Sequence, residues 1–160
     1  MSPRAAWRLE SLGFGEVYDY AGGKLDWMAA GLPTEGSNAT HPRAGDVARK
    51  DVPTSGLAER LGAVRERVRA AGFDAVVVIN SERVVFGLLR SKELDKDPEL
   101  RIELAMRPGP STFRPYVAID EMAEKMTAHQ LESSPITTSD GRLVGLLYRD
   151  DAIRAGGEQG

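Results

Sequence analysis

The feature that most constrains this chain of 160 residues is an internal repeat with a constant spacing of 58 positions. Residues 84–89 read VVFGLL and residues 142–147 read RLVGLL, so that Gly87 aligns with Gly145. The same offset aligns further positions without a gap: Arg49 with Arg107, Thr54 with Thr112, Leu61 with Ile119, Val64 with Met122, Val68 with Met126, and Ser81-Glu82 with Ser139-Asp140. A repeat this regular indicates duplication of one structural unit.

Each copy has the pattern of a β-α-β-β-α unit. Apolar residues recur at helical spacing in the main helix of each copy: Leu57, Leu61, Val64 and Val68, then Ile119, Met122, Ala123 and Met126. We expect a strand before each helix, a hairpin after it and a short closing helix, with strands at 50–54, 75–79 and 83–89, then at 110–113, 134–138 and 142–148. Asp140-Gly141 is a strong hairpin signal.

The predicted fold class is therefore α+β, with two repeats at residues 46–104 and 105–155 and a disordered tail at 156–160. A unit of about fifty residues is near the lower limit for independent stability. Two copies related by a pseudo-twofold axis can bury their apolar faces against each other. The pattern thus favours one fused module over two independent units.

The second copy carries Ser134-Pro135-Ile136 on its first hairpin strand, Asp140-Gly141 in the turn and GLLYRDD at 145–151. This doubled pattern resembles the CBS domain, and two copies in tandem resemble a CBS pair, or Bateman module, over about two-thirds of the chain. The resemblance implies a non-catalytic regulatory protein. It also implies an adenosine-containing ligand of the AMP, ATP or S-adenosylmethionine class, held in clefts between the repeats.

In the family the nucleotide pattern is Gly-apolar-apolar-Thr/Ser-x-x-Asp, and its carboxylate accepts hydrogen bonds from both ribose hydroxyls. Asp151 holds the carboxylate position in the second repeat and Glu93 holds it in the first. The small hydroxyl is replaced by Tyr148 and Arg90. A guanidinium at Arg90 instead suits a phosphate, because its planar donors match phosphate oxygens.

By the same resemblance, each carboxylate works with residues entering the other repeat. These are Val47, Arg49, Phe73 and Asp74 beside Asp151, and Arg107, Leu131 and Glu132 beside Glu93. We rank the Asp151 cleft first, because only Asp151 keeps the family's residue. Two alternatives stay open. The carboxylates also suit the first turn of a helix without any ligand, and the pair also suits a structural dimerisation module with degenerate sites. A homodimer through the CBS helices is expected in either case.

Residues 1–33 have a pattern of their own, a helix-strand-helix fragment that begins at Ser2-Pro3 and has Gly13 as its first helix stop. The strings AWRLESLGF at 6–14, GGKLDW at 22–27 and AGLP at 30–33 resemble the C-terminal third of a rhodanese domain. Sulfur transfer needs a cysteine thiolate, and the chain has no cysteine. The fragment is therefore expected to be inactive, or to be a piece of a longer rhodanese-CBS sulfurtransferase, joined to the repeats by a linker at 34–45.

Composition narrows the remaining classes. The absence of cysteine excludes disulfides and thiolate sites, and the two histidines are too far apart in sequence to predict a metal site. A net charge of −3 gives no reason to expect nucleic acid as a partner. No apolar run approaches the length of a membrane span, so we expect a cytoplasmic protein.

Overall fold

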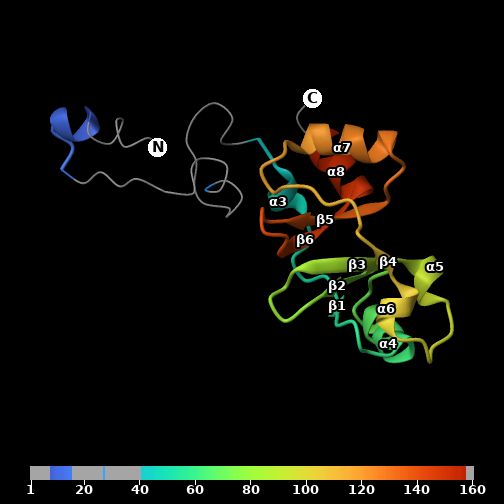
Figure 1. Cartoon of the computed structure of the whole chain (residues 1–160). Coiled ribbons are helices and arrows are strands. Elements are labelled where there is room, and N and C mark those ends of the chain that lie inside the picture. The colour runs from blue at the N-terminus through green and yellow to red at the C-terminus, as the bar shows by residue number, and fades with distance from the viewer. Residues whose placement is uncertain (1–7, 16–26, 28–40, 158–160) are drawn as a thin grey trace.

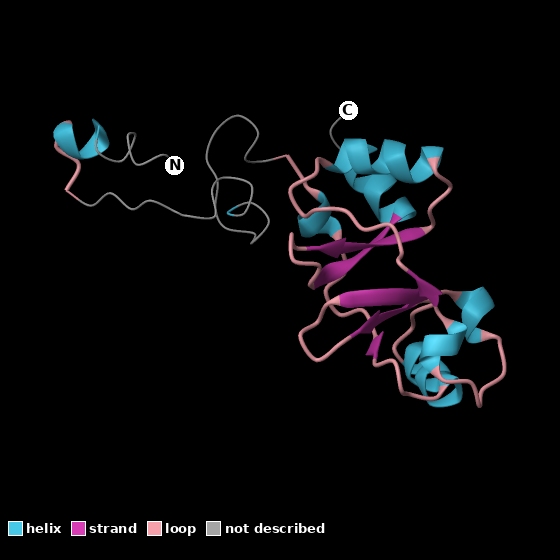
Figure 2. Cartoon of the chain, in the orientation of Figure 1, coloured by secondary structure: helices cyan, strands magenta, loops and turns pink. Residues whose placement is uncertain are grey.

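The computed structural model describes residues 8–15, 27 and 41–157, and its α+β fold has two halves stacked sheet to sheet (Figure 1). The first half contains β1 (Thr54–Ser55), α4 (Leu61–Ala70), β2 (Val76–Ile79), β3 (Val85–Leu89), α5 (Ser91–Leu94), α6 (Ile102–Ala105) and β4 (Arg107–Pro108). The second half contains α3 (Ala44–Val47), α7 (Ile119–Ala128), β5 (Ser133–Thr137), β6 (Leu143–Tyr148) and α8 (Arg149–Gly157). The strands of both halves lie between outer layers of helices (Figure 2).

The predicted duplication is confirmed at the level of whole elements. Helices α4 and α7 are each 10 residues long, and their bounds differ by the predicted offset. The hairpins β2–β3 and β5–β6 are both antiparallel. Each hairpin has a register shift at the equivalent place, between Val78 and Ile79 in the first and between Ile136 and Thr137 in the second. Both copies therefore share one backbone design, including its β-bulge.

Backbone hydrogen bonds between the halves display the predicted pseudo-twofold relation. The amide of Val85 donates to the carbonyl of Gly141 at 3.0 Å. The amide of Leu143 donates to the carbonyl of Arg83 at 2.9 Å, which is the same bond with the two copies exchanged. The two halves are thus joined through the starts of β3 and β6.

Each half also takes one short helix from the other copy, which the sequence did not predict. Helix α3 precedes the first copy, yet Ala44 packs with Ile119 and Met126 in the core of the second half. Helix α6 precedes the second copy, and its Ile102 packs in the core of the first half. The folded module therefore begins before residue 46, within the predicted linker, and the predicted boundary at 104/105 falls inside α6.

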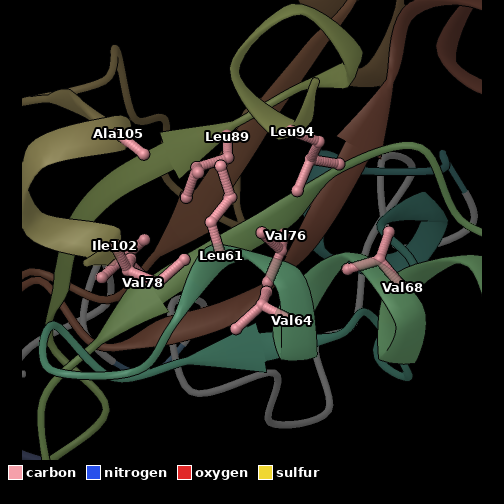
Figure 3. Packing of buried hydrophobic residues seen from close by; sticks show 9 residues of the cluster. All are labelled: Leu61, Val64, Val68, Val76, Val78, Leu89, Leu94, Ile102 and Ala105. Carbon is pink, nitrogen blue, oxygen red and sulfur yellow. The ribbon is translucent and has the colours of Figure 1, made fainter. Parts of the chain in front are cut away.

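The buried apolar residues form one cluster under each helical layer and a third between the sheets. Figure 3 shows the first cluster, where Leu61, Val64 and Val68 of α4 pack against the strands as their helical spacing predicts. The third cluster contains Val52, Ala75, Val77, Leu88, Leu143 and Leu146. Its residues come from both copies, so neither half buries its sheet face alone.

Gly145 is required by the crossing of a segment from the other copy. A Cβ atom at this position would lie 2.7 Å from the carbonyl oxygen of Arg49 and 3.1 Å from the Cβ of Ala48. At the equivalent Gly87, a Cβ would meet the sulfur of Met106 and would lie 3.1 Å from the carbonyl oxygen of Arg107. The repeated glycine, from which the duplication was first visible, is therefore the point where the exchanged segments cross β3 and β6.

Some predicted boundaries are wrong. Leu57 lies before α4 and not within it, although it packs against the same core. The strand predicted at 50–54 shortens to β1, and the one predicted at 110–113 is reduced to a single bridge between Phe113 and Ile136. Pro108 and Pro110 each lack an amide hydrogen, which limits strand pairing here. Helix α8 extends two residues into the predicted tail.

Of the N-terminal fragment, only residues 8–15 and 27 are described. Residues 8–11 are helical and Gly13 has a φ of 92°, in agreement with the predicted stop at this glycine. The rest of the rhodanese-like segment, residues 34–40 of the linker and the last three residues lie outside the described part, so these calls stay predictions. Among the described residues, no helix has the length and apolar character of a membrane span.

Candidate functional site

The two clefts that the resemblance predicts correspond to two places between the halves, each with one of the predicted carboxylates, and we keep the names Asp151 cleft and Glu93 cleft for them. Asp151 lies in the first turn of α8, and Glu93 lies in α5. Both helices follow directly on a hairpin strand, so the backbone brings each carboxylate to the end of a buried sheet. The offset of 58 positions relates the two side chains, and the surrounding residues can be compared position by position.

In the first cleft, Asp151 forms an ion pair with Arg49. The Nε atom of Arg49 lies 2.8 Å from Oδ2 of Asp151, whose side chain is only 15% exposed. This hydrogen bond raises the pKa of Arg49 above its ordinary value, against the effect of burial. Arg49 follows α3, and its backbone exchanges hydrogen bonds with Leu146 of β6. The segment that follows α3 therefore places the Arg49 guanidinium beside the Asp151 carboxylate.

The same guanidinium lies over two aromatic rings. The Arg49 Cζ lies 4.7 Å from the centroid of the Tyr148 ring and 6.0 Å from that of the Phe73 ring. The Tyr148 hydroxyl donates a hydrogen bond of 2.8 Å to Asp74. Burial, together with this bond, raises the pKa of Tyr148 above its ordinary value. Arg49, Phe73, Asp74, Tyr148 and Asp151 are thus brought together as predicted.

Val47 is the exception among the residues predicted for this cleft. It lies at the last position of α3 and packs against the helical core of the second half. Its side chain therefore helps to pack α3 against the second half. Its neighbour Arg49, two positions on, carries the polar contacts of the segment.

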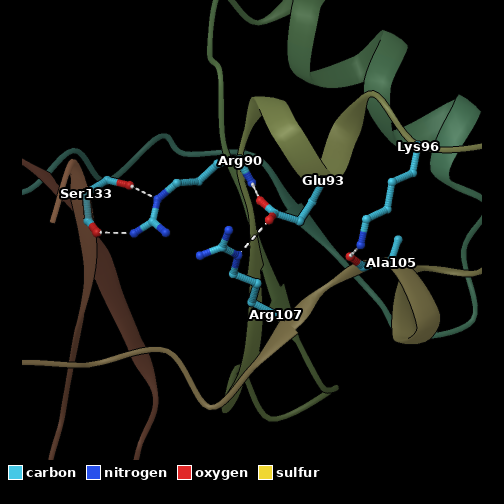
Figure 4. A network of polar contacts seen from close by, with 6 residues as sticks. All are labelled: Arg90, Glu93, Lys96, Ala105, Arg107 and Ser133. Carbon is cyan, nitrogen blue, oxygen red and sulfur yellow. Dashed lines mark hydrogen bonds and ion pairs between the residues drawn. The ribbon is translucent and has the colours of Figure 1, made fainter. Parts of the chain in front are cut away.

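In the second cleft, Glu93 is held by two donors (Figure 4). Nε of Arg107 donates to Oε1 at 2.6 Å, and the backbone amide of Arg90 donates to Oε2 at 3.1 Å. Glu93 is 3% exposed. Burial alone would raise the pKa of Glu93, but these hydrogen bonds outweigh it and hold that pKa below its ordinary value. The carboxylate is therefore ionised and satisfied within the protein.

The side chain of Arg90 reaches across to the other repeat. Its Nη2 donates to the Ser133 carbonyl at 2.7 Å and its Nε lies 3.3 Å from the Ser133 hydroxyl (Figure 4). Tyr148, at the equivalent position, also reaches across to the other copy. Both departures from the family's small hydroxyl thus bridge the repeats. Ser133 was missed from the sequence, because a serine at the start of a strand gives no distinctive signal.

A cavity of about 880 Å³ opens beside the Glu93 cleft. Its lining includes Arg90, Glu93 and Arg107, and extends to both predicted residues Leu131 and Glu132. The other lining residues are Asp74, Ala75, Ser91, Lys92, His129, Gln130, Ser133, Tyr148, Arg149 and Asp150. Neither Arg49 nor Asp151 lines it. The sequence ranked the Asp151 cleft first, whereas this cavity contains Glu93 and reaches only Asp74 and Tyr148 of the residues predicted around Asp151.

The cavity carries charges of both signs. Arg90, Lys92, Arg107 and Arg149 supply cationic groups, and four carboxylates accompany them, from Asp74, Glu93, Glu132 and Asp150. Among the described residues, no group of three or more His, Asp or Glu side chains has the arrangement of a metal site. The chemistry offered is that of hydrogen bonding and ion pairing to a polar small molecule.

The two ion pairs occupy equivalent positions of the two copies. Arg49 aligns with Arg107, and Asp151 aligns with Glu93, both at the offset of the repeat. Each pair joins the segment after an exchanged helix to the closing helix of the half that receives it. The signal was a repeated arginine before the first strand. The resemblance placed each arginine beside its carboxylate, but it did not predict that the two side chains form an ion pair.

A smaller cavity of about 540 Å³ lies away from both clefts, at the end of β1 and β2. It is lined by Ser55, Gly56, Leu57 and Ala58 with neighbours at 54, 59 and 79–81. In the second half, Phe113 occupies the position equivalent to Ser55 and packs against the core. The first half thus has small residues where the second half is filled.

The family model for the CBS domain matches residues 100–158. A CBS domain is therefore present in this part of the chain. The CBS domain pair of protein MJ0100, in complex with 5'-methylthioadenosine and S-adenosyl-L-methionine, superposes with a TM-score of 0.66 at 17% identity, covering 75% of this chain and 99% of that one. The fold is that of a CBS pair.

Other proteins show the same likeness. CBSX2, a CBS-pair protein of Arabidopsis thaliana solved in complex with AMP, has a TM-score of 0.66 at 17% identity, covering 74% of this chain and 98% of that one. The cytosolic domain of the Mg²⁺ channel MgtE in complex with ATP has a TM-score of 0.66 at 22% identity, covering 72% of this chain and 50% of that one.

A relative in sequence is the uncharacterized protein MK0525 of Methanopyrus kandleri, 24% identical over 118 residues. The match covers 69% of this chain and 60% of that protein, so the chain spans less than two-thirds of its relative. At these identities the likenesses establish the fold. The ligand must be argued from the clefts themselves.

Proposed function

We propose that this CBS pair is a non-catalytic regulatory module that binds an adenosine-containing nucleotide in the cavity beside Glu93. The observation that carries the proposal is the cavity itself. Its volume of about 880 Å³ lies within the usual range for small-molecule sites. It lies between the repeats, and its lining includes the residues that the family pattern assigns to the Glu93 site, together with Asp74 and Tyr148 from the Asp151 site.

The charges of the cavity support a phosphorylated ligand. Arg90 and Lys92 belong to the first copy, and Arg107 and Arg149 face the same space from the second. Guanidinium groups bind phosphate through two parallel hydrogen bonds, and such charge-assisted bonds are among the stronger ones in proteins. Arg107 has a side chain 57% exposed, so it can leave Glu93 at little steric cost. In the bound state, the ribose of the ligand donates hydrogen bonds to the Glu93 carboxylate, and its phosphate pairs with Arg107.

Similar proteins support the same ligand class. MgtE was solved with ATP, CBSX2 with AMP, and the MJ0100 pair with 5'-methylthioadenosine and S-adenosyl-L-methionine. All of these ligands contain adenosine and differ in the group attached to it. The cationic side chains of the cavity suit the phosphates of AMP, ADP or ATP, and its carboxylates suit the sulfonium of S-adenosylmethionine.

Thermal unfolding with each nucleotide tests the proposal. A ligand that binds only the folded state stabilises it by about 2.7 kcal/mol at one hundred times its dissociation constant. We expect a rise in Tm with AMP, ADP or ATP, and its loss in Arg107→Ala. Arg60→Ala is the matched control, because Arg60 forms an exposed pair with Glu99 and does not line the cavity. The absence of any rise at millimolar nucleotide would refute the proposal.

A structural module without a ligand is the second candidate, and one observation favours it. Both carboxylates of the family pattern already hold an arginine, Asp151 with Arg49 and Glu93 with Arg107. Pairs that join the two copies stabilise the interface between them whether or not a nucleotide binds. Sedimentation analysis showing a homodimer that no nucleotide alters would favour this candidate, and a strict monomer would exclude a dimerisation role.

A further inference from the structure

We infer that Arg49 is a built-in occupant of the Asp151 cleft, so that this cleft takes a ligand only when the arginine is removed. The inference rests in part on the proposed function, since it takes the Glu93 cavity as the site that binds in the natural chain. It assigns unequal roles to two clefts that the duplication made equivalent.

The first reason is that the carboxylate of Asp151 is already used. Its Oδ2 lies 2.8 Å from Nε of Arg49, and its Oδ1 lies 3.7 Å from Nη1 of Arg154. A ribose diol binds a carboxylate through the same two acceptor oxygens. The guanidinium of Arg49 therefore competes with a ribose for this carboxylate. Because it belongs to the chain, it is always present beside Asp151.

The second reason is the stacking of the guanidinium. It lies 4.7 Å from the Tyr148 ring centroid, with the Phe73 ring 6.0 Å away on the same cation. A planar cation over an aromatic face is attracted by the negative potential of that face. A purine would need the same ring surface for stacking. Arg49 thus takes both the polar and the aromatic contact that a nucleoside requires.

The third reason is the contrast with Arg107. The positions equivalent to Tyr148 and Phe73 are Arg90 and Leu131, which offer no ring. Arg107 is held by Glu93 without an aromatic contact, has a side chain 57% exposed, and lines the cavity of about 880 Å³. Arg49 is 45% exposed and does not line that cavity. Arg107 therefore faces open space that a ligand can enter, whereas Arg49 lies over the Tyr148 ring.

Isothermal titration of the full chain with ATP tests the inference through the number of ligands bound. We expect Arg49→Ala to bind one ATP more per chain than the natural protein. Arg107→Ala, at the equivalent position of the other copy, is expected to add none and to weaken binding. Arg49→Gln provides a second variant that keeps most of the side-chain length, should the alanine variant not fold.

The outcomes separate the inference from the proposed function. If the natural chain binds one ATP and Arg49→Ala binds two, both stand. If the natural chain binds none and Arg49→Ala binds one, the proposed function fails and the inference stands. Equal numbers in the natural chain and the folded Arg49 variant overturn the inference, as do two ligands on the natural chain.

Discussion

The Asp151 cleft and the Glu93 cleft contain the same ion pair in different surroundings. In both, an arginine that follows an exchanged helix meets a carboxylate in a closing helix, at 2.8 Å in one cleft and 2.6 Å in the other. In the first pair the arginine lies over aromatic rings, while the second pair lies beside a cavity of about 880 Å³. The contact that joins the copies is thus the same in both places, while the residues around it differ.

The largest effect is expected at the two repeated glycines. In Gly145→Ala the new methyl group would lie 2.7 Å from the carbonyl oxygen of Arg49, which belongs to the backbone and has no rotamer to adopt. We expect a loss of about 3 kcal/mol in the free energy of unfolding, the upper range for overpacking. Gly87→Ala meets the flexible Met106 side chain first, so we expect roughly half that loss.

Urea unfolding of both glycine variants measures this difference. The expected difference arises because the segment that crosses β6 approaches Gly145 with its backbone, whereas a flexible side chain lies nearest to Gly87 in β3. Equal losses in Gly145→Ala and Gly87→Ala would show that the two crossings are energetically the same. A stable Gly145→Ala would contradict the close approach of Arg49.

The glycines also show how far the sequence could predict this molecule. Their spacing predicted the duplication, the helices α4 and α7 and both hairpins, because these elements carry strong apolar periodicity. It did not predict that α3 and α6 exchange between the halves. Each of these helices has only 4 residues, too few to show a helical period. Pairing across the fold is tertiary information that no local pattern contains.

The candidate site was predicted to a similar degree. The family pattern predicted that Phe73, Asp74 and Tyr148 lie near Asp151 and that Arg107 lies near Glu93. The structure places them there. It could not show that arginines already occupy both carboxylates, since this depends on the exchanged segments. The cavity on the Glu93 side was also beyond prediction, because cavities are set by side-chain packing in three dimensions.

A smaller effect is expected when the buried carboxylate of the second cleft is neutralised. Glu93→Gln removes a charge that accepts hydrogen bonds from Arg107 and from the amide of Arg90. Hydrogen bonds to charged groups contribute about 2 kcal/mol each to stability, and we expect a loss of about that size for the variant at pH 7. Asp151→Asn should cost less, because its side chain is 15% exposed against 5% for Glu93.

The loss in Glu93→Gln should depend on pH with a defined sign. The pKa of Glu93 is lowered in the folded protein, so its contribution is complete above the unfolded pKa of about 4.3 and disappears as the pH falls through the folded value. Unfolding curves at pH 7 and below pH 4 should therefore show the natural chain and the variant converging in acid. A difference that is constant with pH would contradict the ionised, hydrogen-bonded state of Glu93.

The smallest effect concerns two buried serines, and it should have opposite signs in the two halves. Ser55 Oγ is buried and has no hydrogen-bond partner among the described residues, whereas Ser134 Oγ donates to the carbonyl of Ser111 at 2.6 Å. An unsatisfied buried hydroxyl is unfavourable, so Ser55→Ala should stabilise the protein by about 1 kcal/mol, and Ser134→Ala should destabilise it by about the same amount. Thermal unfolding of the two variants side by side measures both signs. A loss of stability in Ser55→Ala would contradict this expectation. It would mean that the Ser55 hydroxyl, at the 540 Å³ cavity, forms a hydrogen bond in the folded protein.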